Sequence, residues 1–431
     1  MRAGHEPEAA ASETVGRAGT SSREPVRRDH DHGHHHDHHH GASADQFVPE
    51  LGTDGTLTEE PHAPRPDRTT RDRATAVGEM VGLYTACIAA ALVLSALLVE
   101  ATGGSSTEVF SALLDGSLRG PGRIGDTIGV AVPLLLVALG TIISNRAGLV
   151  NIGQEGQLYL GAAFGAYVGT RLDIAGPHVL LLVLVASVLG GALWAGIATV
   201  LRYRRNVPEV LTTLLLVTIA AQLVGYGLKN QWLLLAPAEG RSNRQQISEQ
   251  LDPSTRIGRV TWFGNEFPTS AFVAVVLAIV VAVAMTRTIW GLRLRLLGHN
   301  PRTAQRAGVA ASRYGGGALL ISGGFAGLAG GMMLAGGDFG NYTLVPGFPA
   351  TIGWTGLLVA LVSRQRASVA ILIAVVFAAL RTGSGFLAST GVERRITNVV
   401  QGLLVLALLI PPALLFLRQR RRALNSGRDR T

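Results

Sequence analysis

Long apolar runs joined by short polar connections fill most of the chain after about residue 77. A helix needs roughly 20 consecutive apolar residues to cross the hydrocarbon core of a membrane, and about ten runs come near this length. The pattern therefore predicts an all-α, polytopic membrane protein with about ten transmembrane helices. The predicted helices cover residues 77–99, 124–144, 152–170, 178–201, 209–228, 269–288, 313–335, 347–363, 367–388 and 395–417. The eighth of these contains proline and glycine and is expected to be short or re-entrant.

The polar stretch NRAGLVNIGQEGQ, from Asn145 to Gln157, interrupts this pattern. The apolar run after it, Leu158 to Gly169, would form only about 18 Å of helix at about 1.5 Å per residue, against a hydrocarbon core of about 30 Å. The helix must therefore begin near Ile152 and end near Arg171. This start places Gln154, Glu155 and Gln157 at membrane depth, where a carboxylate facing lipid costs roughly 2.5 to 3.5 kcal/mol or more.

Such polar groups are expected to face a protein interior or a water-filled path. The three glycines of the stretch allow irregular backbone, which membranes tolerate only where it is buried or lines a cavity. We therefore predict a permeation pathway here, and the alternative is an ordinary cytoplasmic loop followed by a short, tilted helix. The candidate pathway residues are Asn151, Gln154, Glu155 and Gln157, together with Thr213, Trp354 and Asn398 from later helices.

The last three candidates each have a structural alternative. Thr213 could face the pathway or bond back to its own helix. Trp354 could stack on a base or sugar, or anchor the helix at the membrane interface. Asn398 could contact substrate or form interhelical hydrogen bonds. By contrast, the glycines at spacing four, Gly323, Gly327 and Gly331, are expected to let helices pack closely.

The positions of the charged residues refine the predicted membrane topology. Only 16% of residues are charged against 48% hydrophobic, and the net charge of +9 comes almost wholly from arginine, since Lys229 is the only lysine. In a soluble protein this balance would suggest nucleic acid as a partner. Here the arginine clusters fall on one side of the predicted helices when the N-terminus is placed in the cytoplasm, so both termini are predicted to be cytoplasmic. The expected organisation is a tail at 1–75, a transmembrane domain at 76–418 with a basic loop at 287–313, and a basic tail at 419–431.

The N-terminal tail is polar and lacks hydrophobic periodicity, so it is expected to be disordered. It contains the tract HDHGHHHDHHH, His30 to His40. Imidazoles at this density bind divalent ions, which makes metal handling an open alternative. We expect a solvated tail with incidental affinity and no built metal site, the weak candidate ligands being His34, His35, His36, His38, His39 and His40.

The basic loop RTIWGLRLRLLGHNPRTAQRAGVAASRY, Arg287 to Tyr314, contains a short capped helix. Asn300 is a good N-cap, Pro301 suits the first helical position, and Gly308 suits the position after the helix, which predicts a helix from Pro301 to Ala307. A helix this short is not stable alone, so we expect it to dock onto a partner. The candidate docking residues are Gly298, His299, Asn300, Pro301, Arg302, Gln305 and Gly308.

The chain has no ATP-binding loop of its own. A Walker A loop needs a lysine after its glycines, and Lys229 in YGLKNQ has no such setting. No cofactor is therefore expected on this chain. Transport must be passive or ion-driven, or its energy must come from a separate ATPase through the docking helix.

Four segments carry a resemblance to a known family. They are Asn145–Gln157, RNVPEVLTTLLL at Arg205–Leu216, LLGHNPRTAQRAGV at Leu296–Val309 and GWTGLLVALVSR at Gly353–Arg364. The chain resembles the permease subunits of ATP-binding-cassette (ABC) importers of the branched-chain amino acid, ribose and nucleoside type, and is most similar to the nucleoside permeases. His299 departs from the pattern, since an acidic residue is common at its position.

The resemblance implies a non-enzymatic permease of the bacterial plasma (inner) membrane that moves nucleosides inward by alternating access. Its implied partners are a second homologous permease, cytoplasmic ABC ATPase subunits that use the ATP, an extracytoplasmic substrate-binding lipoprotein and membrane lipid, with no nucleic acid. A pentose or other simple sugar is the alternative substrate. An ion-coupled secondary transporter is the second alternative, for which Glu155 is the only plausible coupling carboxylate.

Overall fold

The computed structural model describes residues 70–101, 105–172, 176–237, 246–348 and 351–387, and single positions between 399 and 417. The N-terminal tail with its histidine tract therefore lies outside the described residues. So does most of the tenth predicted helix, Asn398 included.

Each of the first nine predicted runs contains a helix. The α-helices are α1 Thr70–Ala101, α2 Ser106–Leu114, α3 Arg123–Arg146, α4 Gln154–Arg171, α5 Pro177–Arg205, α6 Glu209–Gly227, α7 Ser270–Arg287, α8 Ile289–His299, α9 Pro301–Arg306, α10 Ala311–Gly336, α11 Ile352–Val362 and α12 Ala367–Leu387. A π-helical turn at Asp115–Arg119 continues α2, and a 3₁₀ turn spans Pro253–Thr255.

A small antiparallel hairpin is the departure from the predicted all-α fold in the described chain. Strand β1, Arg259–Trp262, pairs with β2, Asn265–Pro268, so that Trp262 stands opposite Asn265. The two-residue turn between them, Phe263 and Gly264, has positive φ angles of 48° and 72°. Such backbone matches the twist of a hairpin, with glycine at the second turn position.

Six helices in the described part of the chain are long and apolar enough to cross a membrane, namely α3, α5, α6, α7, α10 and α12. Helix α11 has 11 residues, which at about 1.5 Å per residue is about half of the hydrocarbon thickness. It begins at Ile352 instead of residue 347, because Gly347 and Thr351 have left-handed backbone. The eighth predicted helix is thus short, as expected, and crossing by the remaining segments stays a prediction.

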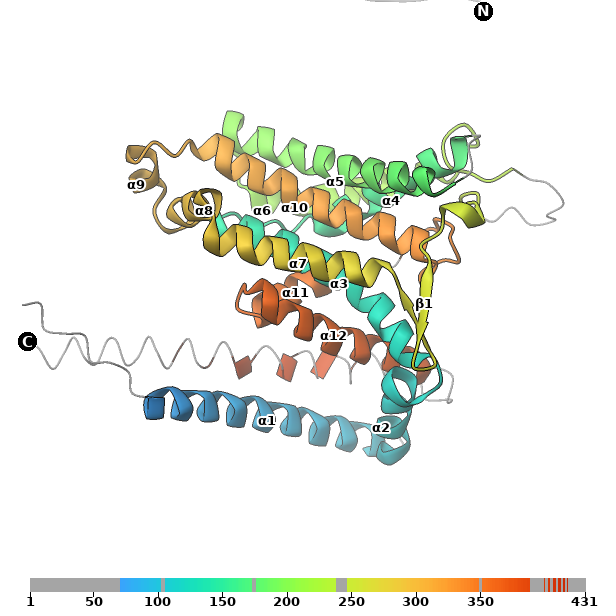
Figure 1. Cartoon of the computed structure of the whole chain (residues 1–431), viewed down its shortest axis with the longest axis vertical. Helices are drawn as coiled ribbons and strands as arrows, with labels where there is room; N and C mark the ends of the chain where they lie inside the picture. The colour runs from blue at the N-terminus through green and yellow to red at the C-terminus, as the bar shows by residue number, and fades with distance from the viewer. Residues whose placement is uncertain are drawn as a thin grey trace, which may run out of the picture. The chain divides into compact units, whose positions relative to one another are not determined.

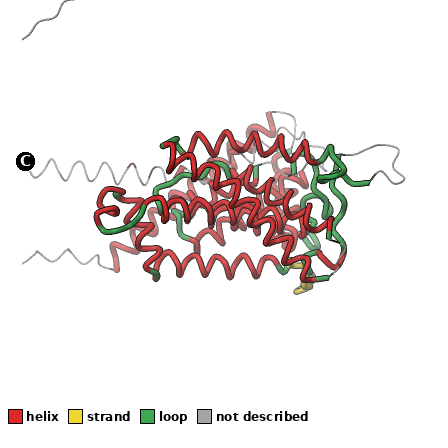
Figure 2. The backbone as a smooth tube through the Cα atoms, turned by 90° about the horizontal axis from the view of Figure 1, so that it is seen from above, coloured by secondary structure: helices red, strands yellow, loops and turns green. Residues whose placement is uncertain are grey.

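The helices lie alongside one another, with α8 and α9 at one end and the β1–β2 hairpin at the other (Figure 1). Seen from above, loops gather at the hairpin end of the bundle (Figure 2). We refer to the end that carries α8 and α9, with Arg287, Arg293, Arg295 and Arg302, as the arginine-rich end.

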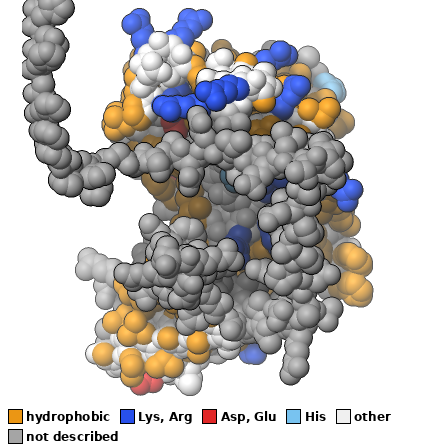
Figure 3. Space-filling model, turned by 90° about the vertical axis from the view of Figure 1, so that its left-hand side faces the viewer, with side chains coloured by type: hydrophobic (Ala, Val, Ile, Leu, Met, Phe, Trp, Pro, Cys, Tyr) orange, Lys and Arg blue, Asp and Glu red, His pale blue; other side chains and the backbone are white. Residues whose placement is uncertain are grey.

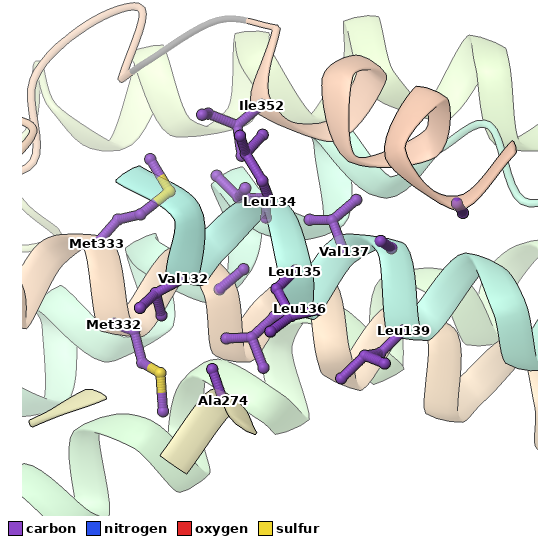
Figure 4. Close-up of a cluster of buried hydrophobic side chains, with 14 of the residues drawn as sticks. Val132, Leu134, Leu135, Leu136, Val137, Leu139, Ala274, Met332, Met333 and Ile352 are labelled. Atoms are coloured by element: carbon purple, nitrogen blue, oxygen red, sulfur yellow. The ribbon is translucent and has the colours of Figure 1, made fainter. Parts of the chain in front are cut away.

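Helix α3 lies at the centre of the bundle. In the most apolar 18 residues of α3, 94% of the residues are buried within the protein. The corresponding share is only 28% in α5 and in α7. Apolar residues from Val132 to Leu139 of α3 pack against Met332 and Met333 of α10, Ala274 of α7 and Ile352 of α11 (Figure 4). The outer helices therefore present apolar side chains to lipid, where such exposure carries no hydrophobic penalty.

Glycine brings α4, α10 and α5 into close contact. A Cβ added to Gly327 of α10 would overlap the carbonyl oxygen of Ser187 in α5 and lie 3.0 Å from the Cα of Gly191. Gly323 and Gly331 meet the same face of α5, and Gly161 of α4 meets Gly327 from another side. The predicted packing role of the glycines at spacing four is confirmed.

Candidate functional site

The connection between α3 and α4 enters the protein interior. Helix α4 runs from Gln154 to Arg171, within two residues of the predicted start at Ile152. Asn151, Gln154, Glu155 and Gln157 are each at most 4% exposed. Gly148 and Val150 at the start of the connection are exposed, whereas the segment from Asn151 onward enters the interior.

A reciprocal pair of amides joins the connection to the first turn of α4. Asn151 Nδ2 donates to Gln157 Oε1 at 2.8 Å, and Gln157 Nε2 donates back to Asn151 Oδ1 at 3.1 Å. Asn151 Nδ2 also donates to Ser322 Oγ of α10 at 2.9 Å. We call the connection between α3 and α4, residues 147–153, the break. Unpaired polar groups at membrane depth are costly, so this network holds the break against α10.

Gln154 extends the network to α3. Its Nε2 donates to the carbonyl oxygen of Val137 at 3.0 Å, and Thr141 Oγ1 donates to Gln154 Oε1 at 2.6 Å. Val137 lies about 14 Å along the axis from the end of α3 at Arg146, at about 1.5 Å per residue. The start of α4 therefore lies well inside the bundle.

Glu155 holds the N-terminus of α11. Its Oε1 accepts a hydrogen bond from the backbone N–H of Thr351 at 2.7 Å, and its Oε2 accepts one from Gly353 at 2.5 Å. Helix N-termini carry unpaired N–H groups that favour a negative partner. A side chain on Gly353 would collide with Glu155, because an added Cβ would lie 2.5 Å from its backbone nitrogen and 2.7 Å from Oε2. Arg381 of α12 donates to Thr351 Oγ1 at 2.9 Å, which joins a third helix to the site.

Thr213 contacts the break from α6. Its Oγ1 accepts from the backbone N–H of Ile152 at 3.3 Å. A Cβ on Gly153 would lie 2.8 Å from the carbonyl oxygen of Thr213, and one on Gly156 would lie 3.0 Å from the Cα of Val217. The expectation that all three glycines serve irregular backbone is therefore wrong: only Gly148 has a positive φ, of 75°, while the other two allow close approach to α6.

Two pathway candidates remain. Trp354 is 41% exposed on α11, and it contacts Glu155 through its backbone N–H. Asn398 lies outside the described residues. Of the seven predicted pathway residues, the four around the break and Thr213 are therefore the ones found buried among the described residues.

The predicted docking helix is present as α9, Pro301–Arg306. Asn300 Oδ1 accepts from the backbone N–H groups of Arg302 at 3.1 Å and Thr303 at 3.2 Å, and Gly308 follows with a φ of 76°. The seven docking candidates Gly298, His299, Asn300, Pro301, Arg302, Gln305 and Gly308 are all exposed. Only Ala304 of this helix is buried, so α9 is free to present its other side chains to a partner.

The basic loop from Arg287 to Tyr314, which carries α9, is called the docking loop below. One contact that sequence patterns do not indicate joins this loop to the break. A Cβ on Gly148 would lie 3.0 Å from the Cα of Gly298, and one on Gly298 would lie 3.0 Å from the backbone nitrogen of Gly148. The end of α8 therefore rests directly on the first turn of the α3–α4 connection. Each glycine is visible in the sequence as a helix-end residue, but nothing in the sequence pairs them.

The hairpin end has a partly exposed ion pair that sequence patterns also missed. Arg259 of β1 donates to Asp338, just after α10. Burial raises the pKa of the Asp338 carboxyl, and the nearby Arg259 charge acts in the opposite direction. This pair joins the hairpin to the end of α10.

An apolar groove of about 350 Å³ runs beside α4 and α6. Phe164 and Tyr167 of α4 line it and are 43% and 45% exposed, and Leu223 and Val224 of α6 lie opposite. Helix α4 therefore carries the polar network in its first turn and forms one wall of this groove farther along.

These features define a multi-pass helical membrane protein with a broken helix inside its core and an exposed helix for docking. Over residues 123–409 the chain matches the family described as branched-chain amino acid transport system / permease component, and it belongs to that family. The protein is thus an ABC transporter permease of the nucleoside and sugar type, an integral protein of the cell membrane and not itself an enzyme. Membership implies ATPase and substrate-binding partners in general.

Relatives include both sugar and nucleoside permeases. The chain is 29% identical to a glucose ABC transporter permease protein of Haloferax volcanii, over 75% of this chain and 85% of the relative. It is also 29% identical to a guanosine ABC transporter permease protein of Bacillus subtilis, over 73% and 89%. A nucleoside ABC transporter permease protein of Lactococcus lactis is 24% identical, over 72% and 86%. No solved structure matches the chain.

Proposed function

We propose that this permease moves nucleosides inward across the plasma membrane by alternating access, driven by ATP that separate ATPase subunits hydrolyse. The chain itself would bind no cofactor. The guanosine and nucleoside permeases among its relatives support this substrate class. The glucose permease of Haloferax volcanii keeps a simple sugar, including a pentose, as the second candidate.

The contact between Gly148 and Gly298 carries the proposal that transport is driven from outside the chain. An ATPase bound to α9 would push on α8, and the end of α8 rests on the α3–α4 connection. That connection is tied through Asn151 to α10 and is followed at once by Glu155, which holds α11. A displacement at the docking loop would thus reach the broken helix directly, as two-state gating requires.

The proposed topology has about ten crossings with both termini in the cytoplasm. The arginine-rich end would then be cytoplasmic, in agreement with the excess of positive charge that cytoplasmic loops carry. A second homologous permease would complete the membrane unit, and a substrate-binding lipoprotein would deliver the solute at the hairpin end. We propose that the groove at Phe164 and Tyr167 faces the path, because aromatic rings offer stacking surfaces to bases and sugars.

The test is uptake by the complete transporter reconstituted in vesicles. The double variant Pro301→Ala/Arg302→Ala should reduce ATP-dependent guanosine uptake by about tenfold or more, because the exposed face of α9 is lost for docking. Membrane insertion should be unchanged. The matched control is Arg313→Ala, an exposed arginine in the first turn of α10, which should transport normally.

The outcomes separate the alternatives. Uptake that persists without any ATPase would contradict the proposal and favour an ion-coupled transporter that uses Glu155. Uptake of guanosine that excess glucose or ribose abolishes, while excess adenosine does not, would favour the sugar candidate.

A further inference from the structure

A basic pocket lies at the arginine-rich end, formed partly by the docking loop and distinct from the groove along α4. It encloses about 290 Å³. Three elements meet around it: the end of α3, the end of α8 and the turn between α11 and α12. The lining residues are Asn145, Arg146, Arg295, Gly298, His299, Arg364 and Gln365. Figure 3 faces this end of the molecule and shows basic side chains on the rim and within the central hollow.

The pocket has no negative charge of its own. The sequence contains no acidic residue between Glu266 and Asp338, and none between Asp338 and Glu393. Arg295 and Arg366 both lie near enough to Arg146 for their charges to repel it. Among the described residues, the ion pairs lie elsewhere and involve none of the pocket's arginines.

The pocket also leaves buried polar atoms without partners. The Nε atoms of Arg146 and Arg295 are buried, and neither has a hydrogen-bond acceptor in the described structure. The amide oxygen of Asn145 is likewise unpaired, and this amide can turn to present its NH₂ group. Arg295 makes one bond, from Nη2 to the carbonyl oxygen of Met285 at 3.2 Å. A buried donor without an acceptor is costly, so an acceptor from outside the chain is expected here.

We propose that the basic pocket binds a phosphate group, carried either by a phospholipid headgroup or by a free phosphate. Guanidinium forks match phosphate oxygens in bidentate geometry, and converging arginines need a multiply charged or multidentate anion. In the proposed topology the arginine-rich end would lie at the level of the lipid headgroups, where basic residues bind anionic lipid. A bound phosphate would bridge the ends of α3 and α8, the two segments that meet at Gly148 and Gly298. The proposal does not depend on which solute is transported.

The experiment measures thermal unfolding of the full-length permease in neutral detergent. One series adds inorganic phosphate against chloride at equal ionic strength. A second adds dihexanoyl phosphatidylglycerol against dihexanoylglycerol, which lacks the phosphate. The wild type should show a saturable rise in Tm with at least one phosphate compound. In Arg364→Gln, an exposed position that should fold normally, the half-saturating concentration should rise about tenfold or more. Arg146→Gln/Arg295→Gln should abolish the response.

The matched control is Arg313→Gln, which lies at the same end but outside the pocket and should respond as the wild type does. A response to inorganic phosphate as well as to lipid assigns the site to free phosphate, and a response to the lipid alone assigns it to a headgroup. No saturable response to either compound would overturn the proposal and leave the arginines for a carboxylate of a partner protein. Equal responses in Arg364→Gln and the wild type would also overturn it.

Discussion

The buried break at the start of α4 and the basic pocket at the end of α3 both hold polar side chains at helix ends, yet they differ in how those groups are satisfied. At the break, Asn151, Gln154 and Gln157 bond to one another and to α3 and α10, and Glu155 bonds to backbone N–H groups of α11. In the pocket, Arg146 and Arg295 keep buried Nε atoms without acceptors.

The difference separates two uses of polarity in a membrane protein. Groups that satisfy each other within the chain hold helices in register, because breaking their bonds in a low dielectric is costly. Groups of one sign that the chain leaves unpaired indicate a ligand that the chain does not supply. The comparison predicts that substitutions at the break act on stability, whereas substitutions in the pocket act on binding.

The largest expected effect on stability is from Glu155→Ala. The free energy of unfolding in mixed micelles should fall by about 2–5 kcal/mol, because the N–H groups of Thr351 and Gly353 lose their acceptors. Glu155→Gln keeps one acceptor oxygen, so its free energy of unfolding should fall by less. The control is Glu249→Ala on an exposed loop. A loss no larger than in this control would show that α11 is held by other contacts.

A smaller effect is expected from the contact between Asn151 and Ser322. A double-mutant cycle with Asn151→Ala and Ser322→Ala should give a coupling energy of about 1 kcal/mol, measured by the same unfolding titration. The value is modest because a helix pair in a membrane finds alternative partners when unfolded. Strictly additive effects would mean that this bond does not join the break to α10.

The smallest effect concerns the hairpin end and depends on pH. Because burial raises the folded-state pKa of Asp338 above its unfolded value, its contribution to stability is fully present below the ordinary pKa of about 4 and is lost as the pH rises through the raised pKa. Arg259 lowers this pKa, so Arg259→Gln should raise it further. The Tm deficit of Arg259→Gln relative to the wild type should therefore grow from about pH 4 to pH 7.

The control for this prediction is the double variant Arg259→Gln/Asp338→Asn. Removing the carboxyl should abolish the growth of the deficit with pH. A deficit that is the same at both pH values in Arg259→Gln would show that the charge of Asp338 does not matter for stability.

The local sequence pattern was sufficient to predict several features of the fold. Apolar runs placed helices in the first nine predicted segments, because run length and hydrophobicity are properties of the sequence itself. Asn300, Pro301 and Gly308 set the ends of α9, because capping acts between residues a few positions apart. The shortage of apolar residues after Gln157 placed the start of α4 to within two residues. The hairpin was missed, although Gly264 marks its turn.

The sequence by itself thus determined which segments are helical, where the core helix breaks and which short helix is exposed for docking. The tertiary structure alone decided what those features contact: Glu155 against the N-terminus of α11, Gly148 against Gly298, and Arg146 beside Arg295. Periodicity and capping are set by near neighbours along the chain, whereas these contacts join segments far apart in sequence. They depend on how glycine faces let the helices approach one another, which no single segment encodes.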